Sequence, residues 1–309
     1  MSKQRPSWEK VQDKDSRDYW STRGYRDSLR LNVQYWLSQR RNPYFVPPDV
    51  DLSTPGLKVA DLGCGTAAFL LELEDQTELS PTAKLVGFDI NPKLFPPPEF
   101  LPKRVVLHKF DILDPDSVPP EYVGAFDVVN ARLLVTVFKG GDPSPFLRIA
   151  SKMLKPRGWL RWTDCKSLSS EFNAVTLDPN RKREASDKVM ARLKAFYTHL
   201  EMKPERFQDW ESTYGLRIVS DTKQQSSPAF WKAATDPTLQ LLEELRDRLP
   251  EVAEESEQGG YVLPTSCNDD LAEAFRMIPG PLLVACLGAN LRVCWRRRYR
   301  NVIMEWQWS

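Results

Sequence analysis

The central third of the sequence is built from short apolar runs that each carry an acidic residue at one end. Three runs end in an acid, at Asp61, Asp89 and Asp111, a fourth begins at Asp127, and a fifth ends at Asp164. Segments of helix length separate most of the runs, a pattern that predicts βαβ units around a parallel sheet and hence an α/β fold. Ligands of such sheets bind beyond the carboxyl ends of the strands. We therefore expect the first three acids to border a ligand site.

Composition and charge exclude several classes of protein. The 309 residues contain 43 Lys and Arg against 42 Asp and Glu, so the chain has no general attraction to nucleic acid or to an anionic membrane. No segment approaches the roughly 20 apolar residues of a membrane span, and the charged N-terminus does not resemble a secretory signal. Five scattered cysteines and two distant histidines argue against a metal site. We expect a cytoplasmic protein, monomeric or homodimeric, that binds a small molecule and no metal.

The first apolar run leads into a glycine turn in the stretch VADLGCGTAAFL, where Gly63 and Gly65 flank Cys64. A dinucleotide site would need a third glycine, but Ala68 stands at that position, and no Gly-Lys-Ser/Thr follows to make a P-loop. Asp61 precedes the turn by two residues and would repel a diphosphate. Its carboxylate instead suits a ligand that carries an ammonium group.

S-adenosylmethionine fits these features, because it has an ammonium group, a ribose diol and an adenine but no phosphate. Gly63 and Gly65 would let the backbone approach its methionine and ribose. Asp89 would accept hydrogen bonds from both ribose hydroxyls, as a carboxylate can. The remaining expected contacts are Asp111 with the adenine amino group, Ile90 and Ile112 with the faces of the ring, and Asn130 near the methyl group. Within the turn, Cys64 is interpreted as a small packing residue at the cofactor rather than a nucleophile.

Outside the central region, the spacing of Leu29, Val33, Trp36 and Leu37 predicts a helix over residues 28–40, capped by Asp27 or Ser28. Arg30 and Gln34 would share one face of that helix. Residues 215–221 and 291–295 are expected to be strands, and residues 282–287 another. Between residues 178 and 249 the sequence predicts helices.

Together these segments resemble the class I S-adenosylmethionine-dependent methyltransferases. The stretches that carry the resemblance are VADLGCGTA, LVGFDIN, KFDILD, FDVVNARLL and MLKPRGWLRWTD. The resemblance is closest to the LaeA-like (UMTA-type) methyltransferases of fungal secondary metabolism. Those proteins share an upstream R-L-x-x-Q helix, matched here by Arg30, Leu31 and Gln34, and a proline-rich stretch, matched by NPKLFPPPEF. Two departures stand out: Arg157 replaces a glycine in LKPRG, and the C-terminal RRRYRNVIMEWQWS matches no part of the pattern.

The resemblance implies a Rossmann-like, seven-stranded sheet with its last strand antiparallel, helices on both faces and a helical cap. Residues 1–50 would form an N-terminal helical arm or lid, and residues 51–165 the core that binds S-adenosylmethionine. Residues 166–309 would supply the cap insert and the C-terminal strands of the same domain. In the arm, Tyr25 and Arg30 could close over the cofactor, with Arg30 suited to the methionine carboxylate.

Methyl transfer from a sulfonium is an in-line displacement, which an enzyme accelerates largely by alignment in a dry pocket. The sequence offers no His-Asp pair as a general base, so His199 and Tyr25 are the catalytic candidates. Asn130-Ala131-Arg132-Leu133 lacks the N-P-P-Y of nucleic-acid amino methylation. A small, partly apolar acceptor is expected, methylated on oxygen or nitrogen without a metal, in a pocket lined by aromatic residues (Trp162, Phe196, Tyr197, Phe230 and Trp231).

Two alternatives remain open at this point. The chain could be a regulatory or interaction protein that keeps a methyltransferase core. It could also bind S-adenosylmethionine and use the sulfonium charge to catalyse a rearrangement without methyl transfer.

Overall fold

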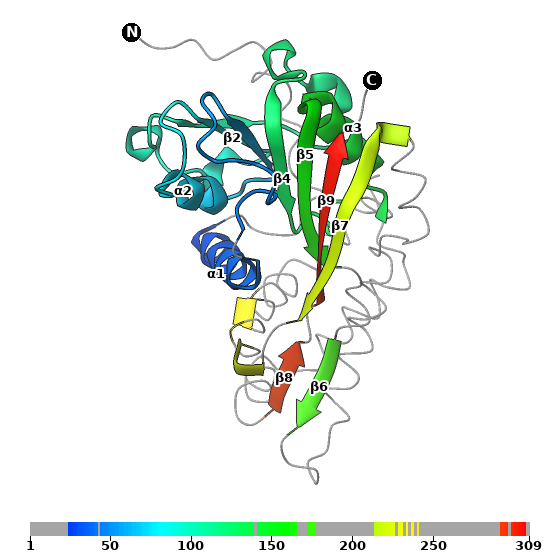
Figure 1. Cartoon of the computed structure of the whole chain (residues 1–309). Helices are drawn as coiled ribbons and strands as arrows, with labels where there is room; N and C mark the ends of the chain where they lie inside the picture. Colours follow the sequence, from blue (N-terminus) through cyan, green and yellow to red (C-terminus); the bar gives the residue numbers. More distant parts are fainter. Residues whose placement is uncertain are drawn as a thin grey trace, which may run out of the picture.

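The computed structural model describes residues 24–42, 44–138, 141–165, 172–176, 213–225, 228–230, 233, 236–237, 240, 291–295 and 298–306. A seven-stranded sheet runs through this part of the chain, in the order β3-β2-β1-β4-β5-β9-β7 (Figure 1). Its strands are β1 (Lys58–Leu62), β2 (Lys84–Asp89), β3 (Val105–Lys109), β4 (Phe126–Arg132), β5 (Leu154–Cys165), β7 (Leu216–Gln225) and β9 (Arg298–Trp306).

Strands β1 to β5 are parallel, which confirms the α/β class expected from the sequence. The chain runs outward from β1 to β3 and then returns to β4 on the other side of β1. This reversal makes the carboxyl ends of β1 and β4 the switch point where open α/β sheets bind ligands. Strand β9 is antiparallel to both β5 and β7.

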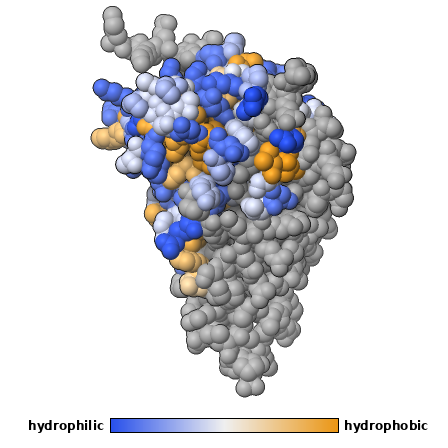
Figure 2. Space-filling model, in the orientation of Figure 1, coloured by the Kyte–Doolittle hydropathy of each residue, from blue (hydrophilic) through white to orange (hydrophobic). Residues whose placement is uncertain are grey.

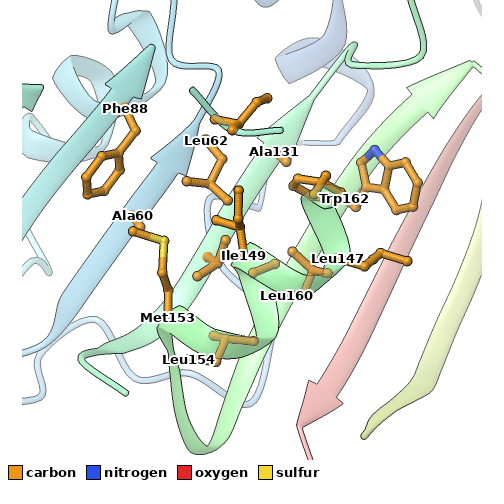
Figure 3. Close-up of a cluster of buried hydrophobic side chains, with 14 of the residues drawn as sticks. Ala60, Leu62, Phe88, Ala131, Leu147, Ile149, Met153, Leu154, Leu160 and Trp162 are labelled. Carbon is orange, nitrogen blue, oxygen red and sulfur yellow. The ribbon is translucent and has the colours of Figure 1, made fainter. Parts of the chain in front are cut away.

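Helices cover both faces of the sheet. On one face, α3 (Ser144–Met153) packs on alternate strand residues, including Ala60 and Leu62 (Figure 3). On the other face, α1 (Tyr25–Arg41) and α2 (Ala68–Glu74) join a second apolar cluster that includes Val59. The two clusters alternate along β1 because successive strand side chains point to opposite faces.

Short elements complete the described residues. The 3-10 turns are η3 (Pro92–Leu94), η4 (Pro98–Phe100), η5 (Pro115–Ser117), η6 (Pro120–Tyr122) and η10 (Pro228–Phe230). Strands β6 (Phe172–Thr176) and β8 (Leu291–Trp295) pair antiparallel in a separate two-stranded sheet. None of the described helices is both long and apolar enough to cross a bilayer.

The N-terminal helix α1 differs from its sequence prediction in its start. It begins at Tyr25 with Gly24 at the N-cap position, so the cap expected at Asp27 or Ser28 is wrong. Asp27 lies in the first turn, fully buried, and accepts hydrogen bonds from the Arg30 guanidinium at 2.9 and 3.2 Å. The ion pair, rather than a cap, is the reason for an acidic residue at this position.

The orientation of α1 is also different. Leu29 and Trp36 are 59% and 48% exposed, and hydrophobic and hydrophilic residues alternate over the surface near this helix in Figure 2. The side chains turned inward include Arg30 and Gln34, which hydrogen bond to each other as their spacing predicts. The buried face of the helix is therefore mixed, with Arg30 and Gln34 beside the apolar Tyr35 and Leu37.

Two further sequence expectations are corrected. The side chain of Trp162, expected in an acceptor pocket, is 2% exposed and packs in the core against Phe138 and Phe146, with ring centroids 5.7 and 5.2 Å away. The C-terminal segment that matched no part of the family pattern contains β9, which lies in the sheet between β5 and the edge strand β7. The strand expected at 291–295 is β8, but it lies in the two-stranded sheet.

Most of the expected helical cap falls outside the described residues. The same holds for His199, for the pocket candidates Phe196, Tyr197 and Trp231, and for the strand expected at 282–287. Arg157, at the family's glycine position, is exposed and takes a left-handed φ of 64°. Arg157 therefore lies within the bounds of β5 and not in the surface turn that the sequence predicted, at the strand start where the register with β4 is irregular.

Candidate functional site

The glycine turn joins β1 to α2 and is pinned to the end of β2. The amides of Gly63 and Cys64 both donate to the carbonyl oxygen of Phe88, at 2.8 and 3.0 Å. Gly63 and Gly65 have φ values of 73° and 54°, which a glycine adopts without steric cost. The two glycines therefore allow the backbone to double back over the ends of the strands.

Residues from three strand ends meet at Gly63. A Cβ atom at this position would lie 2.7 Å from Cδ2 of Leu134 and 3.7 Å from Cδ1 of Ile112. Ile112, which follows β3, was among the expected site residues. Leu134, which follows β4, was not, although it stands directly after the fourth apolar run. A side chain at this position would therefore require Leu134 to shift, in addition to the strain of the positive φ.

Asp89, at the end of β2, is held by two backbone amides. Its Oδ2 atom accepts from Gly65 N at 2.8 Å, and Oδ1 accepts from Asn91 N at 2.9 Å. The side chain is half-buried, and an ionised carboxylate acts only as a hydrogen-bond acceptor. The two backbone amides thus fix the orientation of the carboxylate.

A row of buried polar side chains crosses β1, β4 and β5 beside the turn. Asn130 Nδ2 donates to Asp61 Oδ1 at 2.7 Å, and Arg161 Nη1 donates to Asn130 Oδ1 at 2.7 Å. The three residues are paired in strand register, and none is more than 2% exposed. The sequence predicted that Asn130 follows the fourth strand. In the structure it lies within β4.

The electrostatics of this row centre on Asp61. Burial raises the pKa of its carboxyl group to about 6, although Arg132, the hydrogen bond from Asn130 and Arg161 lower it. Burial likewise lowers the pKa of Arg161 to about 10. The second oxygen of Asp61, Oδ2, is buried and has no hydrogen-bond partner among the residues that the structure describes. Because a buried acceptor without a partner is costly, this site suits a ligand that supplies a donor, such as an ammonium group.

The residues expected to hold an adenine follow β2 and β3. Ile90 is half-buried and Ile112 is buried, whereas Asp111 is exposed and accepts from Leu113 N through Oδ1 at 2.9 Å. Cys64 is buried, and burial raises the pKa of its thiol. The thiol therefore stays protonated, which supports the packing interpretation rather than a nucleophile.

This arrangement combines acceptors for an amine and a diol with a turn that offers no phosphate cradle. A family model described as a methyltransferase domain matches residues 53–226, more than half of the chain.

The chain belongs to this methyltransferase family.

The family match confirms the enzyme class and the S-adenosylmethionine cofactor expected from the sequence. The methyltransferase is 31% identical over 210 residues to the methyltransferase grgD of a Penicillium species, covering 66% of this chain and 70% of grgD. It is 34% identical over 145 residues to the N-methyltransferase tcpN of Claviceps purpurea, covering 45% of this chain and 49% of tcpN. The resemblance to fungal methyltransferases is thereby confirmed, while the match to tcpN spans about half of that protein.

Among solved structures, the methyltransferase is similar to a chain of the complex between the Trm112 methyltransferase activator and a methyltransferase of Haloferax volcanii. The TM-score is 0.51 at 13% identity, with 96% of this chain and 100% of that chain covered. At this identity the similarity shows the fold alone.

Helix α1 of the methyltransferase lies against the glycine turn. Thr66 Oγ1 donates to Asn32 Oδ1 at 2.6 Å, and Cδ1 of Leu31 lies 3.4 Å from the Cβ position of Gly65. Arg30 is buried beside them but hydrogen bonds to Asp27 and Gln34 of its own helix. Tyr25 is 74% exposed at the start of α1. The structure thus brings Leu31 to the turn and leaves Tyr25 at the surface.

The loop after β4 is held by a residue that sequence reasoning did not assign to the site. Asp164 Oδ2 accepts from Leu134 N at 2.8 Å, Val135 N at 2.9 Å and Trp162 Nε1 at 3.2 Å. This buried carboxylate ties the loop that contacts Gly63 to the end of β5. Its place at the end of the fifth apolar run was the signal that could have indicated this role.

Proposed function

We propose that this methyltransferase transfers the methyl group of S-adenosylmethionine to a nitrogen or oxygen atom of a small, partly apolar secondary metabolite. The observation that supports it most directly is the buried, unpartnered Oδ2 of Asp61 beside the glycine turn. A phosphate-free cofactor with an ammonium group is the natural partner for that oxygen. The acceptor class follows from the resemblance of the sequence to methyltransferases of fungal secondary metabolism, and the relatives grgD and tcpN are themselves fungal methyltransferases.

In this proposal, backbone at Gly63, Cys64 and Gly65 approaches the cofactor, and Asp61 binds its ammonium group. Asp89 accepts from the ribose hydroxyls. Asp111, Ile90 and Ile112 hold the adenine, Asn130 lies near the methyl group, and Arg30 binds the methionine carboxylate. Residues 1–50 form the arm, 51–165 the cofactor core, and 166–309 the cap and final strands.

The cofactor supplies an electrophilic methyl group, and the protein supplies alignment and exclusion of water. Where the methyl-accepting substrate must lose a proton, His199 and Tyr25 are the proposed general bases. We propose a metal-independent reaction, so activity should persist in excess chelator. Because tcpN is named an N-methyltransferase, amine and amide acceptors are the first to test.

The test is incubation with methyl-labelled S-adenosylmethionine and a panel of small amines, amides and phenols. We expect S-adenosylhomocysteine and a methylated product in equal amounts, detected by mass spectrometry. Binding of the cofactor with no consumption across the panel, or an altered acceptor with no added methyl group, would contradict methyl transfer and favour a regulatory role or a rearrangement.

A further inference from the structure

We infer that Arg161 is a positioning residue for the cofactor: acting through Asn130, it holds the Asp61 carboxylate so that Oδ2 stays available to the cofactor's ammonium group. This inference rests on the proposed role of Asp61 in cofactor binding. It assigns a function to Arg161, a buried residue on β5, the strand next to β4.

The orientation of the Asn130 amide is dictated by its two neighbours. A guanidinium can only donate, and an ionised carboxylate can only accept. Arg161 Nη1, at 2.7 Å, must therefore face the carbonyl oxygen of the amide, which turns its Nδ2 toward Asp61 Oδ1 at 2.7 Å. Strand register places the three residues side by side, so the row is rigid.

Asn130, which is neutral and stands between Arg161 and Asp61, determines how many oxygens of the Asp61 carboxylate accept a hydrogen bond. An arginine in direct contact could engage both carboxylate oxygens through its two-pronged geometry. The amide of Asn130 engages Oδ1, while Oδ2 has no hydrogen-bond partner within the described part of the chain. The row thus brings a positive charge near Asp61 and leaves one oxygen open.

Burial gives Arg161 a second effect on Asp61. The Arg161 side chain is fully enclosed, and its guanidinium carbon lies 5.8 Å from the centroid of the Phe69 ring on α2. In such surroundings charge–charge interactions are weakly screened. Arg161 therefore favours the ionised form of Asp61, the form that an ammonium group needs.

Other groups act on the same carboxylate from the elements around it. They are Arg132 on β4 and Asp89 on β2. Asp61 in turn raises the pKa of the two neighbouring neutral groups, the Cys64 thiol in the glycine turn and the Tyr35 hydroxyl on α1. Arg132 and Arg161 favour ionisation of Asp61, and Asp89 opposes it. Removal of Arg161 leaves Arg132 as the positive charge of this set and should move the ionisation of Asp61 to higher pH.

The experiment is calorimetric titration of the full chain with S-adenosylhomocysteine between pH 5 and pH 7.5. Wild type is compared with Arg161→Met, which removes the donor and charge at similar length, and with Arg161→Lys, which keeps the charge. We expect Arg161→Met to weaken binding about tenfold near pH 6 and to raise the pH midpoint of binding by about half a unit to one unit. Arg161→Lys should keep the midpoint near the wild-type value but bind more weakly.

Arg104→Met is the matched control. Arg104 precedes β3, pairs with Glu74 at 2.7 Å, and lies at the amino ends of the strands, away from the glycine turn. It should lower thermal stability without moving the pH midpoint. A role of Arg161 in folding alone would likewise weaken stability and leave the midpoint in place.

The outcomes separate this inference from the proposed function. If Arg161→Met binds with the wild-type affinity and midpoint while Asp61→Asn loses binding, the positioning role is wrong and the role of Asp61 stands. If Asp61→Asn also binds normally, the proposed role of Asp61 fails. Should Arg161→Met not fold, Arg161→Lys decides, because unchanged affinity of that variant overturns the inference.

Discussion

The amide of Gly65 donates to Oδ2 of Asp89 at 2.8 Å, so the end of β2 holds the glycine turn that follows β1. The same carboxylate is the proposed partner of the ribose hydroxyls. One residue thus shapes the turn and offers acceptors to the ligand, and its replacement should affect both functions.

Asp89→Ala should reduce affinity for S-adenosylhomocysteine about a hundredfold or more, because hydrogen bonds to a charged group contribute about 1.5–3 kcal/mol each. Calorimetry measures the loss. Asp51→Ala is the control, since Asp51 is an exposed carboxylate that accepts from Ser53 at 2.8 and 2.7 Å. Unchanged affinity in Asp89→Ala would rule out the ribose role.

Gly63→Ala should destabilise the protein more than Gly56→Ala. Both glycines have a φ of 73°, so alanine at either position carries the left-handed strain of about 1–2 kcal/mol. Only at Gly63 does the added Cβ meet another side chain, Leu134 Cδ2 at 2.7 Å, whereas nothing lies within 4 Å at Gly56. The clash adds about 1–3 kcal/mol.

Chemical denaturation of the two glycine variants gives their free energies of unfolding. Equal losses would mean that Leu134 moves aside freely. Gly63→Ala should also weaken cofactor binding, and Gly56→Ala should not.

Asp164→Ala should cost on the order of 3–5 kcal/mol of stability, because one buried carboxylate oxygen accepts from Leu134 N, Val135 N and Trp162 Nε1. Asp164→Asn keeps a neutral oxygen and should cost about 1–2 kcal/mol. Thermal unfolding ranks the two variants. If Asp164→Asn proved less stable than Asp164→Ala, then a side-chain oxygen that accepts from Leu134 N and Val135 N would not be what holds the loop after β4.

Because Asp61 is buried, its ionisation should lower the stability of the folded protein while favouring cofactor binding. Its folded-state pKa of about 6 lies above the ordinary 3.8, so the folded chain binds more protons than the unfolded chain between these values. Its contribution to stability is present at low pH and is lost as pH rises toward and through 6, by about 3 kcal/mol.

Asp61→Asn removes this ionisation. Relative to wild type without cofactor, the variant should gain stability as pH increases from 4 to 7.5, while it loses affinity for S-adenosylhomocysteine. Urea denaturation at several pH values tests the prediction. Parallel stability curves for the two proteins would be incompatible with it.

Cys64 should resist alkylation in the native protein. Its thiol is buried, and burial raises its pKa, so little thiolate is available to react. We expect iodoacetamide at pH 7.5 to modify the peptide that contains Cys64 only after denaturation, as judged by mass spectrometry. Rapid labelling of the folded protein would restore the nucleophile interpretation.

The sequence alone was enough to locate the strand ends near Asp61, Asp89 and Asp111, because acids and glycines interrupt the apolar runs at these positions. It could not reveal the row of Asp61, Asn130 and Arg161. Those residues lie up to 100 positions apart, and they meet only when the order β1-β4-β5 and its register are known.

The N-terminal helix shows a second limit. Apolar spacing located α1, and Leu37 is buried, but Leu29 and Trp36 are exposed, whereas the polar residues Asp27, Arg30 and Gln34 are buried. A periodic pattern identifies two faces and cannot say which one is buried when the neighbouring surface is polar. Likewise β9 was missed, because its partners β5 and β7 are far from it in sequence.

The position of β9 has a consequence for how the chain is made. Strand β7 borders the sheet only through β9, which is synthesised some 70 residues later. Until β9 emerges from the ribosome, β5 and β7 each expose an open backbone edge that can pair with other chains. Nascent or C-terminally clipped copies are therefore the forms of this enzyme that should depend most on chaperones.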